Sequence, residues 1–173
     1  MVEWPLQALN LDSLLKLVRL DKVSTDVLRF GYELGILSES DVVEAELRRM
    51  KDGLDLTNQE TQLASLLSDE LDKVPDLLGP AETDPLPFDP ARVWAYVGVM
   101  LLRARWTENR DAVYELAGLI ESLGTPEPYR ELVYYEKPDK RLRGRGSPGR
   151  FLETIDERLK IDAKELSPVS SEI

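Results

Sequence analysis

The sequence predicts an all-α protein, a single-domain helical bundle of about seven helices. Apolar residues recur at the three- and four-residue spacing of one helix face, and capping residues precede these runs. No segment sustains the alternation of apolar and polar residues that marks a half-buried strand. The chain has 173 residues, of which 42% are hydrophobic, so one domain spanning residues 1–166 can bury its own core.

Three helices are predicted before the first proline-rich stretch. The first begins near Ser24, and its inward face is expected to hold Val27, Phe30, Gly31 and Leu34. The second follows the start signal at residues 38–41 and ends at Gly53, with Val43, Leu47 and Met50 facing the core. The third begins at Thr57 and Glu60, which have capping-box spacing, and is expected to end at Pro75. Its apolar stripe consists of Leu63, Leu66, Leu67, Leu71 and Val74.

A proline-rich connector over residues 77–90 precedes the central helix. Asp89 and Pro90 are typical of an N-cap and a first helical position. The helix that follows, residues 91–106, is apolar on nearly every side, which predicts a central place among the other helices. Trp94, Tyr96 and Trp106 lie in it and are interpreted as core residues.

The rest of the chain predicts three more helices. One ends at Gly124, a short one spans residues 129–135, and the last begins at Ser147 and Pro148. A basic, glycine-containing loop separates the last two over residues 137–149, and residues 167–173 are expected to form a frayed tail. The loop's basic residues are candidates for phosphate binding or for ion pairs with the acidic residues of the segment 39–89.

Histidine and cysteine are absent from the whole sequence. Their absence excludes histidine-assisted nucleophiles and zinc sites of the usual ligands, so carboxylate chemistry remains. Asp69, Asp72 and Asp76 are spaced to share a helix face and to hold Mg²⁺ through oxygen, but Pro75 disrupts that helix and no phosphate-binding glycine loop accompanies them. We therefore expect no catalytic residue, no metal and no cofactor, and we interpret these acids as an exposed face. A carboxylate-based, metal-dependent hydrolase remains the alternative.

Negative charge is concentrated in one segment. Residues 39–89 contain 14 acidic and four basic side chains, which account for ten of the eleven net negative charges. This excess argues against nucleic acid or an anionic membrane as the main partner and favours a basic protein. The longest apolar stretch has ten residues, about half of a membrane span, and the N-terminus lacks a basic leader, so we expect a cytoplasmic protein.

Three stretches resemble a bacterial all-helical family of unknown function. They are Val27–Leu37 with its following Ser38 and Asp41–Val43, the leucine-rich Gln59–Leu71, and Asp111–Lys137 with its Pro126–Glu127 and Tyr134–Tyr135 pairs. Members of that family are encountered among candidate immunity proteins of polymorphic-toxin loci. The resemblance carries no catalytic residue. It implies an antidote that occupies the active surface of a toxin, and a basic cleft of a nuclease toxin would suit an acidic helical face.

The predicted partner surface combines the densest acids with three tyrosines, since tyrosine is enriched at interfaces. It consists of Asp69, Glu70, Asp72, Asp76, Glu82, Asp84, Tyr129, Tyr134 and Tyr135. The expected function is a non-catalytic, protein-binding module that is a monomer or a homodimer. A self-associating helical scaffold is a further alternative, which light scattering would reveal.

Overall fold

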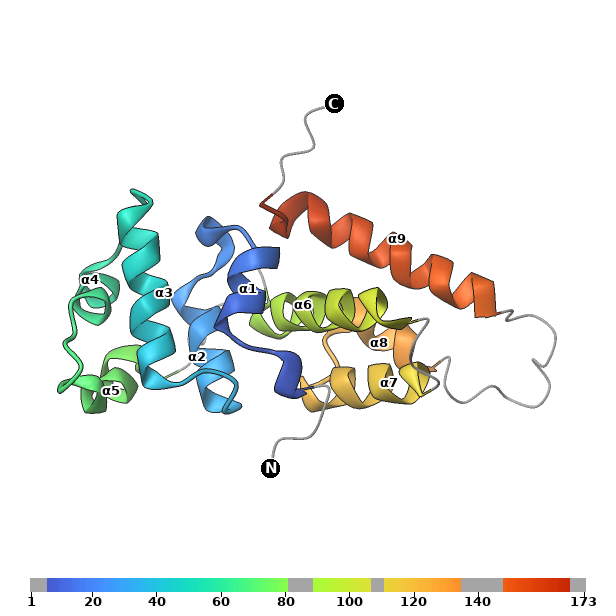
Figure 1. Cartoon of the computed structure of the whole chain (residues 1–173), viewed down its shortest axis with the longest axis horizontal. Helices are drawn as coiled ribbons and strands as arrows, with labels where there is room; N and C mark the ends of the chain where they lie inside the picture. Colours follow the sequence, from blue (N-terminus) through green and yellow to red (C-terminus); the bar gives the residue numbers. More distant parts are fainter. Residues whose placement is uncertain (1–5, 81–88, 107–110, 135–147, 169–173) are drawn as a thin grey trace.

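The fold is all-helical throughout the part of the chain that the structure describes (Figure 1). The structure is a computed structural model, and it describes residues 6–80, 89–106, 111–134 and 148–168. For Leu6, Tyr134 and residues 148–150 it describes the backbone alone. Nine α-helices and three short 3₁₀ helices lie within these ranges, and none of the described residues forms a strand. The all-α prediction is confirmed. The number of α-helices is larger than the predicted seven because a helix at residues 11–17 was not predicted and the helix predicted from Thr57 to Pro75 forms two.

Five short elements form the first part of the fold. They are η1 (Leu6–Ala8), α1 (Leu11–Leu17), η2 (Leu20–Lys22), α2 (Thr25–Glu33) and α3 (Glu39–Lys51). The predicted start signals are confirmed, because the side chains of Ser24 and Ser38 each accept a hydrogen bond from a backbone N–H in the first turn of α2 and α3. At Ser38, Asp41 completes a capping box by accepting from the Ser38 N–H.

The buried face of α3 differs from the predicted one. Val43 and Leu47 are only half-buried, and Met50 is 40% exposed. The residues that face the interior are Val42, Ala45, Glu46 and Arg49. The predicted stripe is therefore wrong by about one position, since two of the four inward residues are charged and hydrophobicity alone does not mark them.

The segment predicted as one helix from Thr57 to Pro75 is interrupted at residues 65–70. Its elements are α4 (Asn58–Ala64), η3 (Leu71–Lys73) and α5 (Val74–Leu78). The capping box of Thr57 and Glu60 is confirmed. Leu67, which the stripe placed inward, lies in the turn after α4 and is 65% exposed. Pro75 does not end a helix but lies in the first turn of α5, where its missing N–H has no partner to lose.

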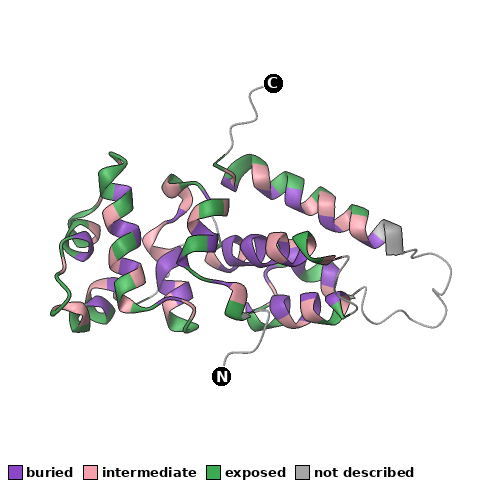
Figure 2. Cartoon of the chain, in the orientation of Figure 1, coloured by how far each residue is buried: buried purple, intermediate pink, exposed green. Residues whose placement is uncertain are grey.

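Helix α6 (Pro90–Ala104) is the centre of the fold, as predicted. Asp89 caps it by accepting from the Ala91 N–H at 2.9 Å. Nine of its residues are buried, and it packs against η1, α1, α2, α7, α8 and α9 (Figures 1 and 2). The indole N–H of Trp94 donates to the carbonyl oxygen of Val27 at 2.9 Å, which fixes α6 against α2. Trp94 and Tyr96 are core residues, as the sequence indicated.

Helices α7 (Ala112–Ser122), α8 (Glu127–Tyr134) and α9 (Pro148–Leu166) complete the fold around α6, and in Figure 1 α9 lies above α6 and α7 below it. Asp162 of α9 is fully buried and accepts hydrogen bonds from Arg92 of α6 and from the hydroxyl of Tyr129 in α8, the latter at 2.5 Å. This cluster attaches α9 to both neighbouring helices. Where the structure describes the chain, no helix has the length and apolar character that a membrane crossing requires.

The connecting segments lie mostly outside the described residues. Of the predicted connector over 77–90, residues 77 and 78 belong to α5, and residues 81–88 are not described. The predicted basic loop shares residues 148 and 149 with α9, and its residues 137–147 are not described. Of the predicted tail, Ser167 donates its backbone N–H to Ala163, and residues 169–173 lie beyond the described part.

Candidate functional site: an acidic end with an open groove

Residues 39–80 of the acidic segment form one end of the molecule, which consists of α3, α4, η3 and α5 (Figure 1). Residues 39–80 contain eleven acidic and four basic side chains, whereas the described residues of α6 and the segments after it contain ten acidic and eight basic ones. Six acids of the first set are exposed, against three exposed bases, Arg48, Lys51 and Lys73. The exposed acids are Glu44, Asp52, Asp55, Asp69, Asp72 and Asp76. This end therefore has a negative surface.

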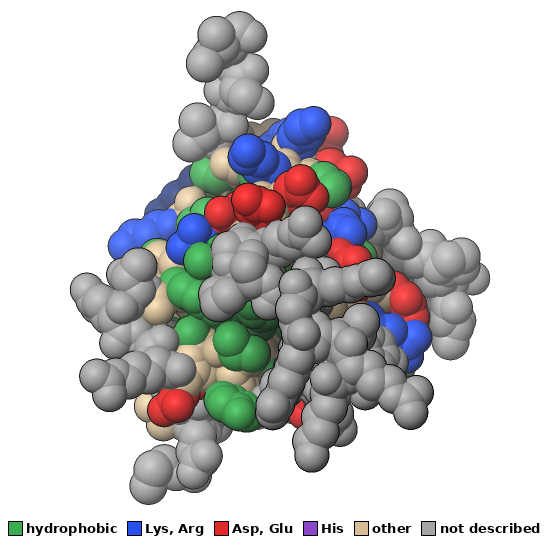
Figure 3. Space-filling model, turned by 90° about the vertical axis from the view of Figure 1, so that its right-hand side faces the viewer, with side chains coloured by type: hydrophobic (Ala, Val, Ile, Leu, Met, Phe, Trp, Pro, Cys, Tyr) green, Lys and Arg blue, Asp and Glu red, His purple; other side chains and the backbone are tan. Residues whose placement is uncertain are grey.

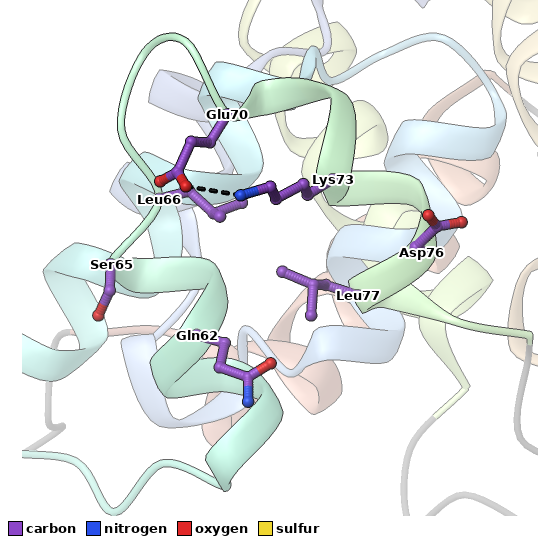
Figure 4. A pocket seen from close by; sticks show the side chains of 7 residues that line it. All are labelled: Gln62, Ser65, Leu66, Glu70, Lys73, Asp76 and Leu77. Atoms are coloured by element: carbon purple, nitrogen blue, oxygen red, sulfur yellow. Dashed lines mark hydrogen bonds and ion pairs between the residues drawn. The ribbon is translucent and has the colours of Figure 1, made fainter.

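An open groove of about 460 Å³ lies at this end, between α4 and the η3–α5 segment (Figure 4). Its lining consists of Gln62, Ser65, Leu66, Glu70, Lys73, Asp76 and Leu77. In Figure 4, the side chain of Leu77 points into the space between the two segments, and Lys73 reaches across to Glu70. The groove thus has apolar walls with charged groups at its edges.

The charges at the groove are only partly compensated. Lys73 Nζ lies 2.6 Å from Glu70 Oε1, and this hydrogen bond lowers the pKa of Glu70. The other oxygen of Glu70 accepts from the backbone N–H of Leu67 at 3.2 Å. Asp76 is exposed and has no hydrogen-bond or ion-pair partner among the described residues. Asp76 is therefore the carboxylate in this groove that is available to an outside cation.

Two side chains from other helices hold α5 in place beside the groove. Arg29 of α2 is buried, and its guanidinium donates to the carbonyl oxygens of Leu78 and Gly79 at the end of α5. These carbonyls have no partner within the helix, so the guanidinium supplies one. From α4, the Gln59 amide donates to the carbonyl of Leu77. The α5 side of the groove is thereby held to α2 and α4.

A second group of charges at this end is internal. Glu46 of α3 is fully buried, and its Oε2 accepts from Arg49 Nη1 at 2.9 Å. The same nitrogen lies 3.4 Å from Glu60 Oε1 of α4. The Thr25 hydroxyl, at the start of α2, lies 3.1 Å from Glu46 Oε1 and 2.8 Å from Glu60 Oε1. One guanidinium and one hydroxyl thus join α2, α3 and α4 through two carboxyl groups.

The two carboxyl groups of this cluster differ in acidity. Burial raises the pKa of Glu46 to about 7; the Arg49 charge and hydrogen bonds from Thr25 and Arg49 oppose this rise, and the charge of Glu60 adds to it. Burial also acts to raise the pKa of Glu60, but the Thr57 backbone N–H, Thr25 and Arg49 together lower it below its usual value. Sequence analysis missed Thr25, Glu46 and Arg49. The only available signal was the three-residue spacing of Glu46 and Arg49 on a helix whose apolar stripe is weak.

The structure brings together only part of the predicted partner surface. Glu70 and Asp76 line the groove, while Asp69 and Asp72 are exposed next to it. Glu82 and Asp84 lie outside the described residues.

The three predicted tyrosines lie elsewhere. Tyr129 is fully buried and donates its hydroxyl to Asp162, so it does not present a surface to a partner, and its prediction as a partner-binding residue is corrected. Tyr134 ends α8 with its backbone alone described, and Tyr135 lies outside the described residues.

The three aspartates whose spacing could place them on one helix face lie in different elements. Asp69 lies in the turn after α4, Asp72 in η3 and Asp76 in α5. Over the described ranges, no three or more Asp and Glu side chains are grouped as a metal ion would require.

The opposite end of the molecule, which faces the viewer in Figure 3, differs in character. Acidic and basic side chains are interspersed on its upper part, and hydrophobic side chains gather below them. Ion pairs link Arg103 to Asp156 at 2.8 Å and Arg158 to Glu131 at 3.6 Å. Among the described residues, the excess of acid is therefore concentrated at the α3–α5 end.

Comparisons with known proteins place the chain in a family but assign no activity. No curated protein and no solved structure matches the sequence. The sequence profile of a family described as an uncharacterized protein conserved in bacteria, DUF2247, matches residues 17–163, which include α2 to α8 and most of α9. The chain belongs to this bacterial family of unknown function, DUF2247.

Proposed function

We propose that this protein is a cytoplasmic, non-catalytic binding module that neutralises a bacterial toxin by covering a basic active surface with its α3–α5 end. The observation that carries the proposal is the separation of charge: exposed acids outnumber exposed bases by six to three over residues 39–80, and an open groove lies among them. A basic surface is the complement of this end. Charge complementarity of this kind directs encounter and selects the partner.

The groove suits a lysine or arginine side chain of the partner. The apolar walls at Leu66 and Leu77 match the aliphatic stem of such a side chain, and the carboxylate of Asp76 matches its charged end. The acids outside the groove act at longer range. Screening extends over about 8 Å at physiological ionic strength, so these acids contribute mainly to the rate of association.

The proposal is tested with a charge-neutralised variant in which Asp69, Asp72 and Asp76 are changed to Asn. All three side chains are exposed, so the melting temperature should stay within about 2 °C of that of the unmodified protein. The variant is expressed together with the product of each gene adjacent to its own, tested as the candidate toxin, and survival of the cells is measured. We expect protection to be lost, and association measured by surface plasmon resonance to become slower and less sensitive to salt.

A matched control removes the same charge elsewhere. Glu121 of α7 and Glu153 and Glu157 of α9 are exposed, and changing them to Gln also neutralises three acids. This control should protect as well as the unmodified protein. Full protection by the folded triple-Asn variant, or equal loss in both variants, would refute the α3–α5 end as the partner surface.

A further inference from the structure

The two contacts that join the oxygen atoms of Thr25, Glu46 and Glu60 require one more proton than the Thr25 hydroxyl supplies. The Thr25 hydroxyl lies within hydrogen-bonding distance of both Glu46 Oε1, at 3.1 Å, and Glu60 Oε1, at 2.8 Å. A hydroxyl has one proton, so it can donate to only one of the two. If both carboxyl groups were ionised, the second contact would set two oxygens without a proton against each other. A proton on one carboxyl group makes both contacts hydrogen bonds.

The environment of each carboxyl group indicates which one holds that proton. Glu60 retains 13% of its side-chain exposure and accepts the capping hydrogen bond from the Thr57 N–H at 3.0 Å, which requires an acceptor oxygen. Glu46 has no exposed side-chain surface, and its one charged donor is Arg49, which it shares with Glu60. Ionised Glu46 would be a buried carboxylate that shares its one counter-ion with Glu60, so Glu46 is the carboxyl group that is more costly to ionise.

We propose that below neutral pH Glu46 is protonated and donates its proton to Thr25 Oγ1, while the Thr25 hydroxyl donates to Glu60. This chain of hydrogen bonds links α3 to α2 and α2 to α4, and Arg49 closes it from the other side. Ionisation of Glu46 breaks the chain and leaves two carboxylates to share one guanidinium. The junction of α2, α3 and α4 is therefore a clamp that is closed when Glu46 is protonated and weakened when it is ionised.

The other charged groups near α3 do not act on Glu46. Besides α2 and α4, the elements that pack against α3 are η2, η3 and α5. Asp21 of η2 pairs with Arg19, and Lys73 of η3 pairs with Glu70. The remaining charged residues are Lys22, which is half-buried, and Asp72 and Asp76, which are exposed. On α2 itself, Asp26 pairs with Arg29. The groups that act on Glu46 are Arg49, Glu60 and Thr25.

The clamp makes stability depend on pH in a defined direction. Because the pKa of Glu46 is raised from 4.5 to about 7 in the folded protein, its contribution is fully present below pH 4.5 and is lost as the pH rises towards 7. A shift of this size corresponds to a change on the order of 100-fold in the unfolding equilibrium constant. Glu60, whose pKa is lowered, acts in the opposite direction at more acidic pH.

The decisive variant is Glu46→Gln, because an amide can donate to Thr25 and accept from Arg49 as the protonated acid does. Urea unfolding is measured at intervals from pH 5.5 to 8.5 for the unmodified protein, for Glu46→Gln and for Glu44→Gln. Glu44 lies on the same helix with 51% side-chain exposure, so its variant is the matched control. We expect unfolding constants to rise with pH in the unmodified protein and the control, and this rise to shrink at least tenfold in Glu46→Gln.

A direct titration makes the outcome independent of how well the variant folds. The side-chain carboxyl carbons of the unmodified protein are followed by ¹³C NMR from pH 4 to 9, and the Glu46 signal is assigned by its loss in Glu46→Gln. A midpoint near pH 7 supports the clamp, and a fall of that midpoint in Thr25→Val supports the role of the hydroxyl as acceptor, because burial, the main cause of the raised pKa, remains in the variant. A Glu46 midpoint near 4.5, or an unchanged pH dependence in Glu46→Gln, would overturn it.

Discussion

Two helical glycines should respond in opposite ways to replacement by alanine. Gly31 lies in α2 and Gly118 lies in α7, so at both positions an alanine would gain about 0.5–1 kcal/mol from helix propensity alone. At Gly118, a Cβ atom would meet no heavy atom within 4 Å. At Gly31, it would lie 2.6 Å from Cζ2 of Trp94 and 3.0 Å from Cδ1 of Leu37. Only the first site has room for the methyl group.

The clash at Gly31 cannot be relieved by a side-chain rotation. The Trp94 ring is fully buried, and its N–H is held by the Val27 carbonyl at 2.9 Å. Relief requires α2 to move away from α6, which breaks close packing at the centre of the fold. Overpacking of this kind costs about 1–3 kcal/mol, so after the gain in propensity we expect a net loss of about 1–2 kcal/mol. For Gly118→Ala we expect a gain of about 0.5–1 kcal/mol.

Thermal unfolding followed by circular dichroism at the helical band separates these outcomes. About 1 kcal/mol corresponds to a change of roughly 2–4 °C in a protein of this size. The melting temperature should fall for Gly31→Ala and rise for Gly118→Ala. Equal increases in both variants would show that the α2–α6 contact has room for a methyl group, and that the packing described for Trp94 is wrong.

Three further predictions concern the core and the caps. Asp162→Ala should lower the free energy of unfolding by about 3–5 kcal/mol in denaturant titrations, because Arg92 and the Tyr129 hydroxyl lose their shared buried partner; a loss below about 1 kcal/mol would contradict this. Thr57→Ala should cost about 1 kcal/mol in the same assay, whereas Thr57→Ser should restore most of it. Val97→Ala should cost on the order of 2 kcal/mol and Glu44→Gln under about 0.5 kcal/mol, and equal losses would show that α6 is not the core.

The parts of the fold that follow from local chemistry were predictable from the sequence. Helix starts at Ser24, Ser38, Thr57 and Asp89 were recognisable because each cap is a bond between a side chain and a backbone N–H within a few residues. The central place of α6 followed from its own sequence, which has apolar side chains on nearly every side of the helix. Both signals depend on a short stretch of sequence and require no knowledge of distant partners.

Features that depend on tertiary partners were not predictable in the same way. The inward face of α3 was misplaced because Glu46 and Arg49 are buried by contacts with α2 and α4, and those contacts lie 11 or more residues away in sequence. The helix predicted from Thr57 to Pro75 breaks after Ala64, where Ser65 and the following turn replace a leucine-rich continuation. Tyr129 was predicted as an interface residue because tyrosine is enriched at interfaces. Its buried partner Asp162 lies 33 residues further along, so the sequence around Tyr129 did not indicate the contact.

The candidate site was half predictable for a related reason. Net charge identified the segment whose described residues form the α3–α5 end, because charge is additive along a sequence. Net charge did not distinguish the acids that face outward from those that face inward. Only the fold separates Asp76, which faces solvent beside the groove, from Glu46, which is buried beneath α4.

This separation changes how the acidity of the segment bears on function. Ionisation of Glu46 acts on the α2–α3–α4 junction, while the charge of Asp69, Asp72 and Asp76 is available to a partner. A variant that neutralised acids without regard to burial would disturb folding and binding together, and its loss of protection would have two causes. Restricting the change to exposed acids, and testing Glu46 by stability alone, keeps the two roles apart. If partner binding then changes near pH 7 and Glu46→Gln removes this change, the cluster of Thr25, Glu46, Arg49 and Glu60 also affects the groove, because α4 contributes to both.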